Sequence, residues 1–154
     1  MTSLTAIIRT HNDAIRLGRA LETLYACDEI VILDDQSTDR TVGLAYEYGA
    51  KVTRNSSVAD IASAAKPGWI ICLLPNESAT EGLAASLYEL KSVDIAERAY
   101  CVSLREETAQ GWSERATIHT RVVPTHWKHW QNHLPAPDPS AEPLAGEILR
   151  FSFP

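Results

Sequence analysis

The 154-residue chain has 14 basic and 20 acidic side chains, a formal net charge of -6 and 45% hydrophobic residues. Its length and apolar content suit a single globular domain, and its negative charge argues against nucleic acid or an anionic membrane surface as a partner, because both would be repelled. No apolar run approaches the roughly 20 residues of a membrane-spanning helix and the first residues lack a signal peptide's apolar stretch, so we expect a soluble, cytoplasmic protein without membrane insertion.

The cysteines Cys27, Cys72 and Cys101 are odd in number, widely spaced and set among apolar residues. No two of them are close enough in sequence for a CxxC redox site or a metal-binding knuckle. We expect buried, unpaired thiols, which a reducing compartment favours.

The first 90 residues alternate between short apolar, β-branched runs and stretches in which apolar residues recur every three or four positions. This pattern predicts an α/β fold with a Rossmann-like, mostly parallel sheet and helices on both faces. The predicted strands are 4–9, 29–34, 50–53 and 69–74, and the predicted helices are 14–24, 41–48, 58–65 and 78–90. Ser78-Ala79-Thr80-Glu81 has the spacing of a capping box that would open the last helix.

Polar residues follow the predicted strands at the edge where ligands bind in such sheets. Asp34 comes directly after a buried strand, where a carboxylate accepts hydrogen bonds from a base N–H or from ribose hydroxyls. The structural alternative is that these are ordinary turn and cap residues, with Asn12 or Asp13 capping the first helix and Asp39 the second. We favour that alternative for Asp39 and a binding role for Asp34.

At these positions the sequence resembles the family 2 glycosyltransferases. The resemblance rests on Arg9-Thr10-His11-Asn12-Asp13, on the run from Asp28 to Thr41, and on Leu44 to Lys51. It implies a GT-A-type fold and a nucleotide-sugar as the partner. It also implies a nucleotide-binding role for a set of residues in the first two loops: Thr10, His11, Asn12, Asp13, Asp34 and Asp35.

The metal motif of the resembled family, Asp-x-Asp, falls here on Leu74-Pro75-Asn76-Glu77, which contains no aspartate. Mg²⁺ and Mn²⁺ prefer anionic oxygen ligands, and Asn76 and Glu77 are only remnants of such a set. The departure argues against a metal-dependent mechanism, and no other cofactor is predicted. A cation from the protein would then replace the metal, and four side chains remain open for that role: Arg9, Arg40, Arg121 and Lys128.

A catalytic base does not emerge from the sequence. Family members activate the acceptor hydroxyl with an acidic residue from a later segment, but Glu106, Glu107 and Glu114 lie in no recognisable motif. We interpret these three side chains as surface charges.

The second half of the chain is less regular, with strands predicted at 99–104 and 116–123. His129 and His133 would share one face of a helix and bind a metal, but proline flanks the segment and no acid lies between them, so we do not expect a metal site there. For Trp127 and Trp130 we favour rings that cover a core edge over stacking on a sugar or base. We expect one domain over 1–154, with the following parts: a nucleotide-binding half 1–90, an irregular β-rich part 91–133, a proline-rich connection 134–146, and a terminal strand 147–154 at a sheet edge or a homodimer contact.

Three functions remain open from the sequence. The first is a small glycosyltransferase-like domain that binds a nucleotide-sugar and transfers the sugar to an unknown acceptor. The second is a catalytically inactive module of the same fold that binds nucleotides or proteins. The third is a nucleotidyltransferase, against which the glycine-free loop 10–13 counts, because that class has a glycine-rich phosphate loop after its first strand.

Overall fold

The computed structural model describes residues 1–153. Its elements follow in chain order: β1 (Ser3–Thr10), α1 (Ala14–Glu22), β2 (Glu29–Asp34), α2 (Thr41–Glu47), β3 (Lys51–Thr53), α3 (Val58–Ala64), β4 (Gly68–Leu73), β5 (Glu77–Ala79), α4 (Glu81–Leu90), β6 (Tyr100–Thr108), β7 (Gly111–Trp112), β8 (Thr117–Pro124), β9 (Trp130–Gln131), β10 (Leu134–Pro135) and β11 (Glu142–Arg150).

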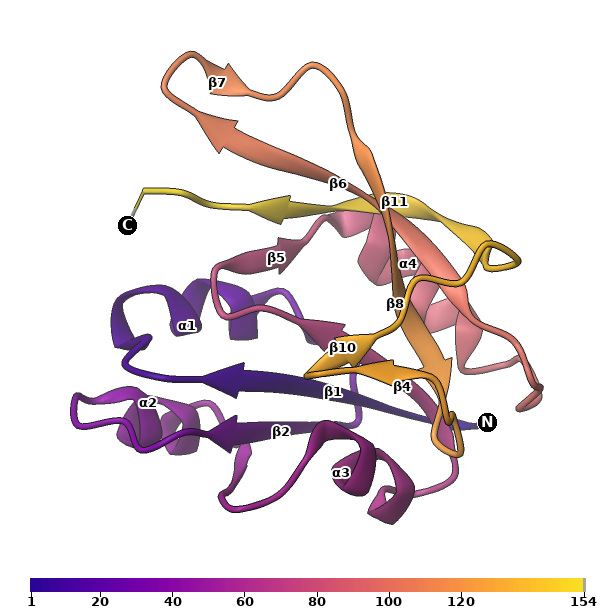
Figure 1. The fold of residues 1–154 in the computed structure, drawn as a ribbon, viewed down its shortest axis with the longest axis horizontal. Helices are drawn as coiled ribbons and strands as arrows, with labels where there is room; N and C mark the ends of the chain where they lie inside the picture. The colour runs from indigo at the N-terminus through magenta and orange to yellow at the C-terminus, as the bar shows by residue number, and fades with distance from the viewer. Residues whose placement is uncertain (154) are drawn as a thin grey trace.

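One nine-stranded sheet organises the chain, with the strand order β3-β2-β1-β4-β8-β6-β11-β5 and β7 paired to β6 (Figure 1). The first four of these strands are parallel, as the alternating pattern of the sequence predicts. β8 is antiparallel to both of its neighbours, β4 and β6. The predicted α/β class is therefore confirmed.

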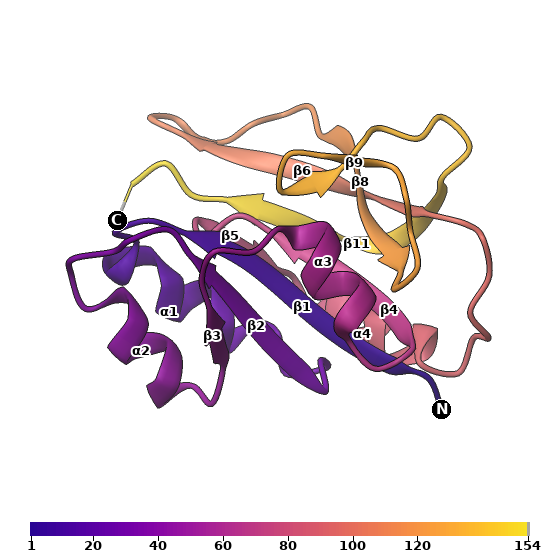
Figure 2. The same cartoon turned by 60° about the horizontal axis from the view of Figure 1, so that its bottom comes forward.

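Two hydrophobic cores lie on opposite faces of the sheet, because successive side chains of a strand point to opposite faces. In β1, Leu4, Ala6 and Ile8 pack in the core beneath α1, α2 and α4. Ile7 joins the second core, which contains residues of α3 and Trp127. Figure 2 shows α3 crossing one face of the sheet. The helices thus cover both faces.

The three cysteines are free, as expected from their spacing. Burial raises the pKa of the Cys72 thiol to about 12, so this group is a neutral core side chain near pH 7. No helix within residues 1–153 has the length and apolar character needed to cross a membrane.

The start of α4 differs from the predicted capping box. Ser78 lies in β5, and the N-cap is Thr80, whose hydroxyl accepts a hydrogen bond from the Leu83 amide at 3.3 Å. The prediction was wrong because Ser78 is buried and pairs with Leu149 of β11. That pairing joins residues far apart in sequence and has no local signal.

The C-terminal strand lies inside the sheet, so the prediction of an edge strand at 147–154 was wrong. β11 begins at Glu142, within the segment predicted as a connection, and is parallel to β6 on one side and antiparallel to β5 on the other. β5 pairs with Ile148, Leu149 and Arg150 only, so both backbone edges of β11 are paired at its C-terminal end. The strand is clearly seen between β6 and β5 in Figure 1.

The Trp/His segment forms a hairpin rather than a helix. β9 and β10 are joined by a two-residue turn at Asn132 and His133, and Asn132 has a φ of 58°. A helical face shared by His129 and His133 is therefore not present. The hairpin instead places Trp130 and Leu134 against the second core, which contains Trp127.

Gly146 lets β11 pass the first turn of α4 at close range. Its φ is +99°, and an added Cβ would lie 2.0 Å from the Leu83 nitrogen. Beside it, the Glu147 amide donates to the Thr80 hydroxyl at 2.9 Å, and the Glu147 carbonyl accepts from the Thr80 amide at 3.0 Å. The bulge that these contacts require falls between Pro143 and Glu147.

We expect Gly146→Ala to lower the free energy of unfolding by more than about 2 kcal/mol, because the new methyl group meets backbone atoms at a positive φ. Gly43→Ala in α2 is the matched control, since no atom lies within 4 Å of the added Cβ; it should raise the stability by up to about 1 kcal/mol. Urea denaturation followed by circular dichroism measures both. Similar effects of the two substitutions would contradict this account of the bulge.

Candidate functional site

Three loops at the carboxyl ends of β1, β2 and β3 form the candidate site. Each contains a non-glycine residue in the left-handed region, two positions after its strand: Asn12 (φ 52°), Gln36 (φ 55°) and Asn55 (φ 55°). Residues in this conformation cost energy and are found preferentially at functional sites. The repetition at three neighbouring strand ends marks this edge of the sheet as the place to look for a ligand.

Asp34 is the buried anchor of these loops. Its side chain is 0% exposed, and its carboxylate accepts hydrogen bonds from the Thr10 hydroxyl at 2.8 Å, the Ser37 hydroxyl at 2.6 Å and the Ser37 amide at 3.0 Å. Burial alone would raise the pKa of Asp34, but these hydrogen bonds and the charge of Arg54 outweigh it and lower the pKa. The carboxylate is therefore charged at neutral pH.

Hydrogen bonds from side chains predicted to lie near the site join the loop after β1 to the loop after β2. The Asn12 side-chain oxygen accepts from the Thr38 amide at 2.8 Å and from the Asp39 amide at 3.3 Å. Asp39 in turn accepts from the Ala14 amide at the start of α1 and from the Thr41 amide at the start of α2. Asp39 therefore has a structural role, as we favoured, but the N-cap of α2 is Arg40 rather than Asp39, and Asp39 contacts the first residues of two helices.

Three adjoining cavities extend from these loops across the sheet. A cavity of about 420 Å³ lies over Asp34 and is walled by Arg9, Asp35 and the segment 54–56. The next, of about 390 Å³, shares Arg9 with the first and continues to Asn132 and His133. The third, of about 670 Å³, shares Asn132 and His133 with the second. We call these three adjoining cavities together the trough.

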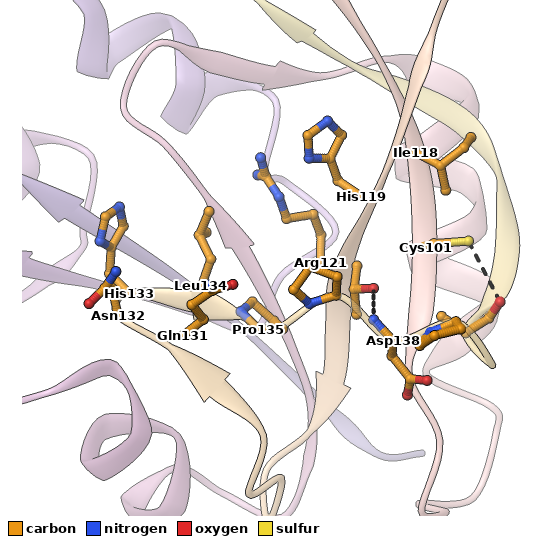
Figure 3. Close-up of a pocket in the computed structure, with 14 residues that line it drawn as sticks. Cys101, Ile118, His119, Arg121, Gln131, Asn132, His133, Leu134, Pro135 and Asp138 are labelled. Atoms are coloured by element: carbon orange, nitrogen blue, oxygen red, sulfur yellow. Dashed lines mark hydrogen bonds between the residues drawn. The ribbon is translucent and has the colours of Figure 1, made fainter.

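The third cavity is drawn in Figure 3. His119 and Arg121 reach it from β8, and Asn132 and His133 from the β9–β10 turn. Burial, together with the charges of Arg121 and Arg150, lowers the pKa of His119. Burial and then the charges of Arg9 and Arg121 lower the pKa of His133. Both imidazoles are therefore neutral near pH 7.

The six residues predicted to bind nucleotide separate into two groups. Asp34 and Asp35 line the trough. Thr10, Asn12 and Asp13 build the loops behind it: Asp13 accepts from the His11 amide, and its own amide donates to Thr41. The exposed His11 ring donates from Nδ1 to the Asp35 carbonyl at 2.6 Å.

Several lining residues were missed by the sequence analysis. Arg54, Asn55 and Ser56 follow β3, a strand of three residues with no motif of its own. His133 was considered only as a metal ligand on a helix, yet it lies where two cavities meet. The sequence did contain one signal for this loop: an asparagine, Asn55, stands two positions after the strand, and asparagine tolerates the left-handed conformation.

Glu77 lies at the end of the loop that corresponds to the metal motif, and it forms a buried ion cluster. It is 0% exposed. Arg121 donates to both of its oxygens, at 2.6 Å and 3.0 Å, and Arg150 donates to Oε2 at 2.9 Å. The Leu74 amide completes the set at 2.7 Å. Burial alone would raise the pKa of Glu77, but Arg121 above all, with the Leu74 amide and Arg150, lowers it.

The residues at this position do not fit a metal ion. Leu74 has no ligating atom, and the Asn76 amide group donates to the Phe151 carbonyl at 3.1 Å. Both oxygens of Glu77 are engaged by arginine. Within residues 1–153, no three His, Cys, Asp or Glu side chains come together as a metal set. The loop after β4 therefore offers no carboxylate that is free to bind a hard divalent cation.

Comparison with known proteins agrees with this arrangement of strands and loops. The model of glycosyl transferase family 2 matches residues 5–87, more than half of the chain. The chain belongs to this family. An uncharacterized glycosyltransferase from Rickettsia felis is 42% identical over 53 residues, which cover 34% of this chain and 19% of that protein. The chain thus spans about a fifth of the length of the curated relatives it matches.

Solved structures show the same GT-A fold at low sequence identity. S. aureus TarS 1-349 in complex with UDP-GlcNAc is 17% identical, with a TM-score of 0.50 over 71% of this chain and 36% of that one. Glucosyl-3-phosphoglycerate synthase from Mycobacterium tuberculosis, in complex with Mn²⁺, UDP and phosphoglyceric acid, is 13% identical, with a TM-score of 0.51 over 71% and 45%. These likenesses establish the fold.

Three of the later acidic residues of this family 2 chain are engaged in structural contacts. Glu106 accepts from Arg150 at 2.9 Å, and Glu107 accepts from the amides of Ser152 and Phe153. In the third cavity, Asp138 accepts from the amide and hydroxyl of Ser140. None of these contacts singles out a catalytic base.

We expect Arg121→Met to lower the free energy of unfolding by roughly 3–5 kcal/mol, because it removes the main partner of a buried carboxylate. Arg40→Met is the matched control: Arg40 pairs with Glu47 on the surface, and its loss should cost less than about 1 kcal/mol. Chemical denaturation at pH 7 compares the two. A change below about 1 kcal/mol for Arg121→Met would refute a stabilising role for the cluster.

The cluster also predicts how stability depends on pH. Because folding lowers the pKa of Glu77, its contribution is complete above the ordinary glutamate pKa of about 4.3 and is lost as the pH falls through the folded value. The difference in unfolding free energy between the unmodified protein and Glu77→Gln should therefore shrink as the pH falls below about 4. Denaturation curves from pH 7 to pH 3 measure it. A difference that stays constant over this range would exclude Glu77 as the titrating group.

Proposed function

We propose that this family 2 domain binds a nucleotide-sugar in the trough, with the nucleoside over Asp34. The observation that carries the proposal is the trough itself, which begins at the carboxyl ends of β1, β2 and β3 and continues past Arg9 to His133. Ligands of doubly wound sheets bind outside these strand ends. The relatives support the choice of ligand, since related folds hold UDP or UDP-GlcNAc.

Asp34 and Asp35 are the proposed contacts for the nucleoside. The Asp34 carboxylate has about four acceptor positions, and Thr10 and Ser37 fill three of them. The remaining position, on Oδ2, lies 3.6 Å from Arg54 beside the cavity that Asp34 borders, and a ligand reaches it when Arg54 moves aside, because the Asp34 side chain is 0% exposed. It suits a base N–H or a ribose hydroxyl, and the three internal hydrogen bonds hold it in place before the ligand arrives.

The sugar then lies toward the third cavity, which offers neutral imidazoles and amide side chains for its hydroxyl groups. His119, Asn132 and His133 line this space. Transfer to an acceptor would rest on positioning and on electrostatic stabilisation of the departing diphosphate. The acceptor itself is not identified by these residues.

A second candidate function is nucleotide-sugar binding without transfer. It is favoured by one observation: the position of the metal motif is taken by Leu74, Asn76 and the buried Glu77 cluster. A domain that keeps the nucleoside loops but has converted the metal loop to a structural role fits a binding module. The same trough serves both functions.

We expect UDP, GDP or dTDP to shift the amide NMR resonances of residues around the trough. The shifts should be concentrated in residues 9, 35–36 and 54–56, because these surround the cavity over Asp34. A ¹H–¹⁵N titration of the 17.0 kDa protein resolves them, with the α4 residues as an internal control. Absence of shifts at millimolar concentrations of all three nucleotides would refute the proposed function.

The matching nucleotide-sugars then separate the two candidates. Chromatography measures whether the nucleoside diphosphate is released from its sugar, and such release supports a transferase. Binding with no release over hours, with or without acceptor sugars, supports the binding module.

A further inference from the structure

A nucleoside diphosphate brings several negative charges into the trough, and the metal set that would neutralise them does not fit this chain. The protein must therefore supply the positive charge if it binds such a ligand. The argument rests on the proposed function, and it asks which basic side chains are placed to meet the phosphates.

Most of the basic candidates are committed elsewhere. Arg121 and Arg150 are held by the buried Glu77. Arg40 forms its surface pair with Glu47. Lys128 lines a separate cavity beside α3. None of these side chains reaches the cavity over Asp34, and two of them cannot leave their partner without exposing a buried charge.

Arg9 is placed differently, at the point where the first two cavities meet. Its Nη2 atom lies 2.7 Å from Asp35 Oδ2, and the two side chains are 41% and 52% exposed. An exposed ion pair contributes only about 0–1 kcal/mol. Arginine binds phosphate with two parallel, charge-assisted hydrogen bonds, which are stronger than such a pair. Exchange of Asp35 for a phosphate therefore costs little.

Arg54 faces the same cavity from the end of β3. Its Nε atom lies 3.6 Å from Asp34 Oδ2, too far for a hydrogen bond, and the side chain is 54% exposed. Thr10 and Ser37 hold the Asp34 carboxylate in place with three hydrogen bonds that do not involve Arg54. Arg54 is thus attracted to the site by charge, while its hydrogen-bond donors remain available to a ligand.

We propose that the trough binds a nucleoside diphosphate without a divalent metal, and that Arg9 and Arg54 neutralise the phosphates in its place. Arg9 is the principal cation, because it borders both cavities and connects the nucleoside end with His133. Arg54 assists from the end of β3. The lowered pKa of His133, to which the charge of Arg9 contributes, agrees with a positive potential at this junction.

Isothermal titration calorimetry with UDP, GDP and dTDP, each in EDTA and then in Mn²⁺, tests the proposal. At least one diphosphate should bind in EDTA, and Mn²⁺ should change its Kd by less than about threefold. Arg9→Gln should weaken that diphosphate by roughly 10-fold or more, the loss expected for a charged hydrogen bond. Arg54→Gln should have a smaller effect in the same direction.

The controls distinguish the loss of a positive charge beside the phosphates from unfolding of the variant and from loss of the contacts to the nucleoside. Arg40→Gln should leave the affinity unchanged, and the corresponding nucleoside without phosphates should bind Arg9→Gln and the unmodified protein equally. Circular dichroism verifies that the variants, all at exposed positions, are folded.

Each failure has its own meaning. Diphosphate binding only with Mn²⁺ overturns the metal-free site and leaves the proposed function intact. Equal affinity for the unmodified protein and Arg9→Gln overturns the assignment of Arg9. No binding of any of the three diphosphates under either condition overturns both this inference and the proposed function.

Discussion

The buried carboxylate of Glu77 is the constraint on which the second half of the fold depends. A charge taken out of water is stable only with close partners, and these come from β8 through Arg121 and from β11 through Arg150. The end of the β4 loop, the antiparallel β8 and the C-terminal strand must therefore meet in one register. Arg121 also donates to the Cys72 carbonyl at 3.2 Å, which ties the cluster to β4 itself.

This cluster withdraws the polar groups of one loop from the candidate site. The loop after β4 is where the family's metal motif falls, and here its polar groups are turned inward to Arg121, Arg150 and the Phe151 carbonyl. The negative charge of Glu77 in this loop binds Arg121 of β8 and Arg150 of β11, and it is not available to a ligand. Positive charge at the nucleoside end of the trough lies instead at the ends of β1 and β3, on side chains whose present ion pairs are weak.

The loops after β1 and β2 are fixed by short-range hydrogen bonds, so the nucleoside end of the trough is organised before any ligand is present. Asn12 bridges to Thr38 and Asp39, and Asp34 gathers Thr10 and Ser37. The left-handed residues Asn12 and Gln36 store strain that this network offsets. A preorganised loop loses little conformational entropy on binding, which favours affinity for a small ligand.

Much of the first half of the fold could be predicted from local signals, because alternating apolar runs and helical periodicities located β1 to β4, the helices between them and Asp34 at a strand end. The remaining features depend on contacts between residues far apart in the chain. Nothing local to Glu77 indicates a partner 44 residues away in Arg121, and nothing local to 142–150 predicts a strand inserted between β6 and β5. Arg9 and Arg54 likewise meet at one cavity because parallel strands bring their ends together, whereas sequence periodicity records only which face of its own strand a residue occupies.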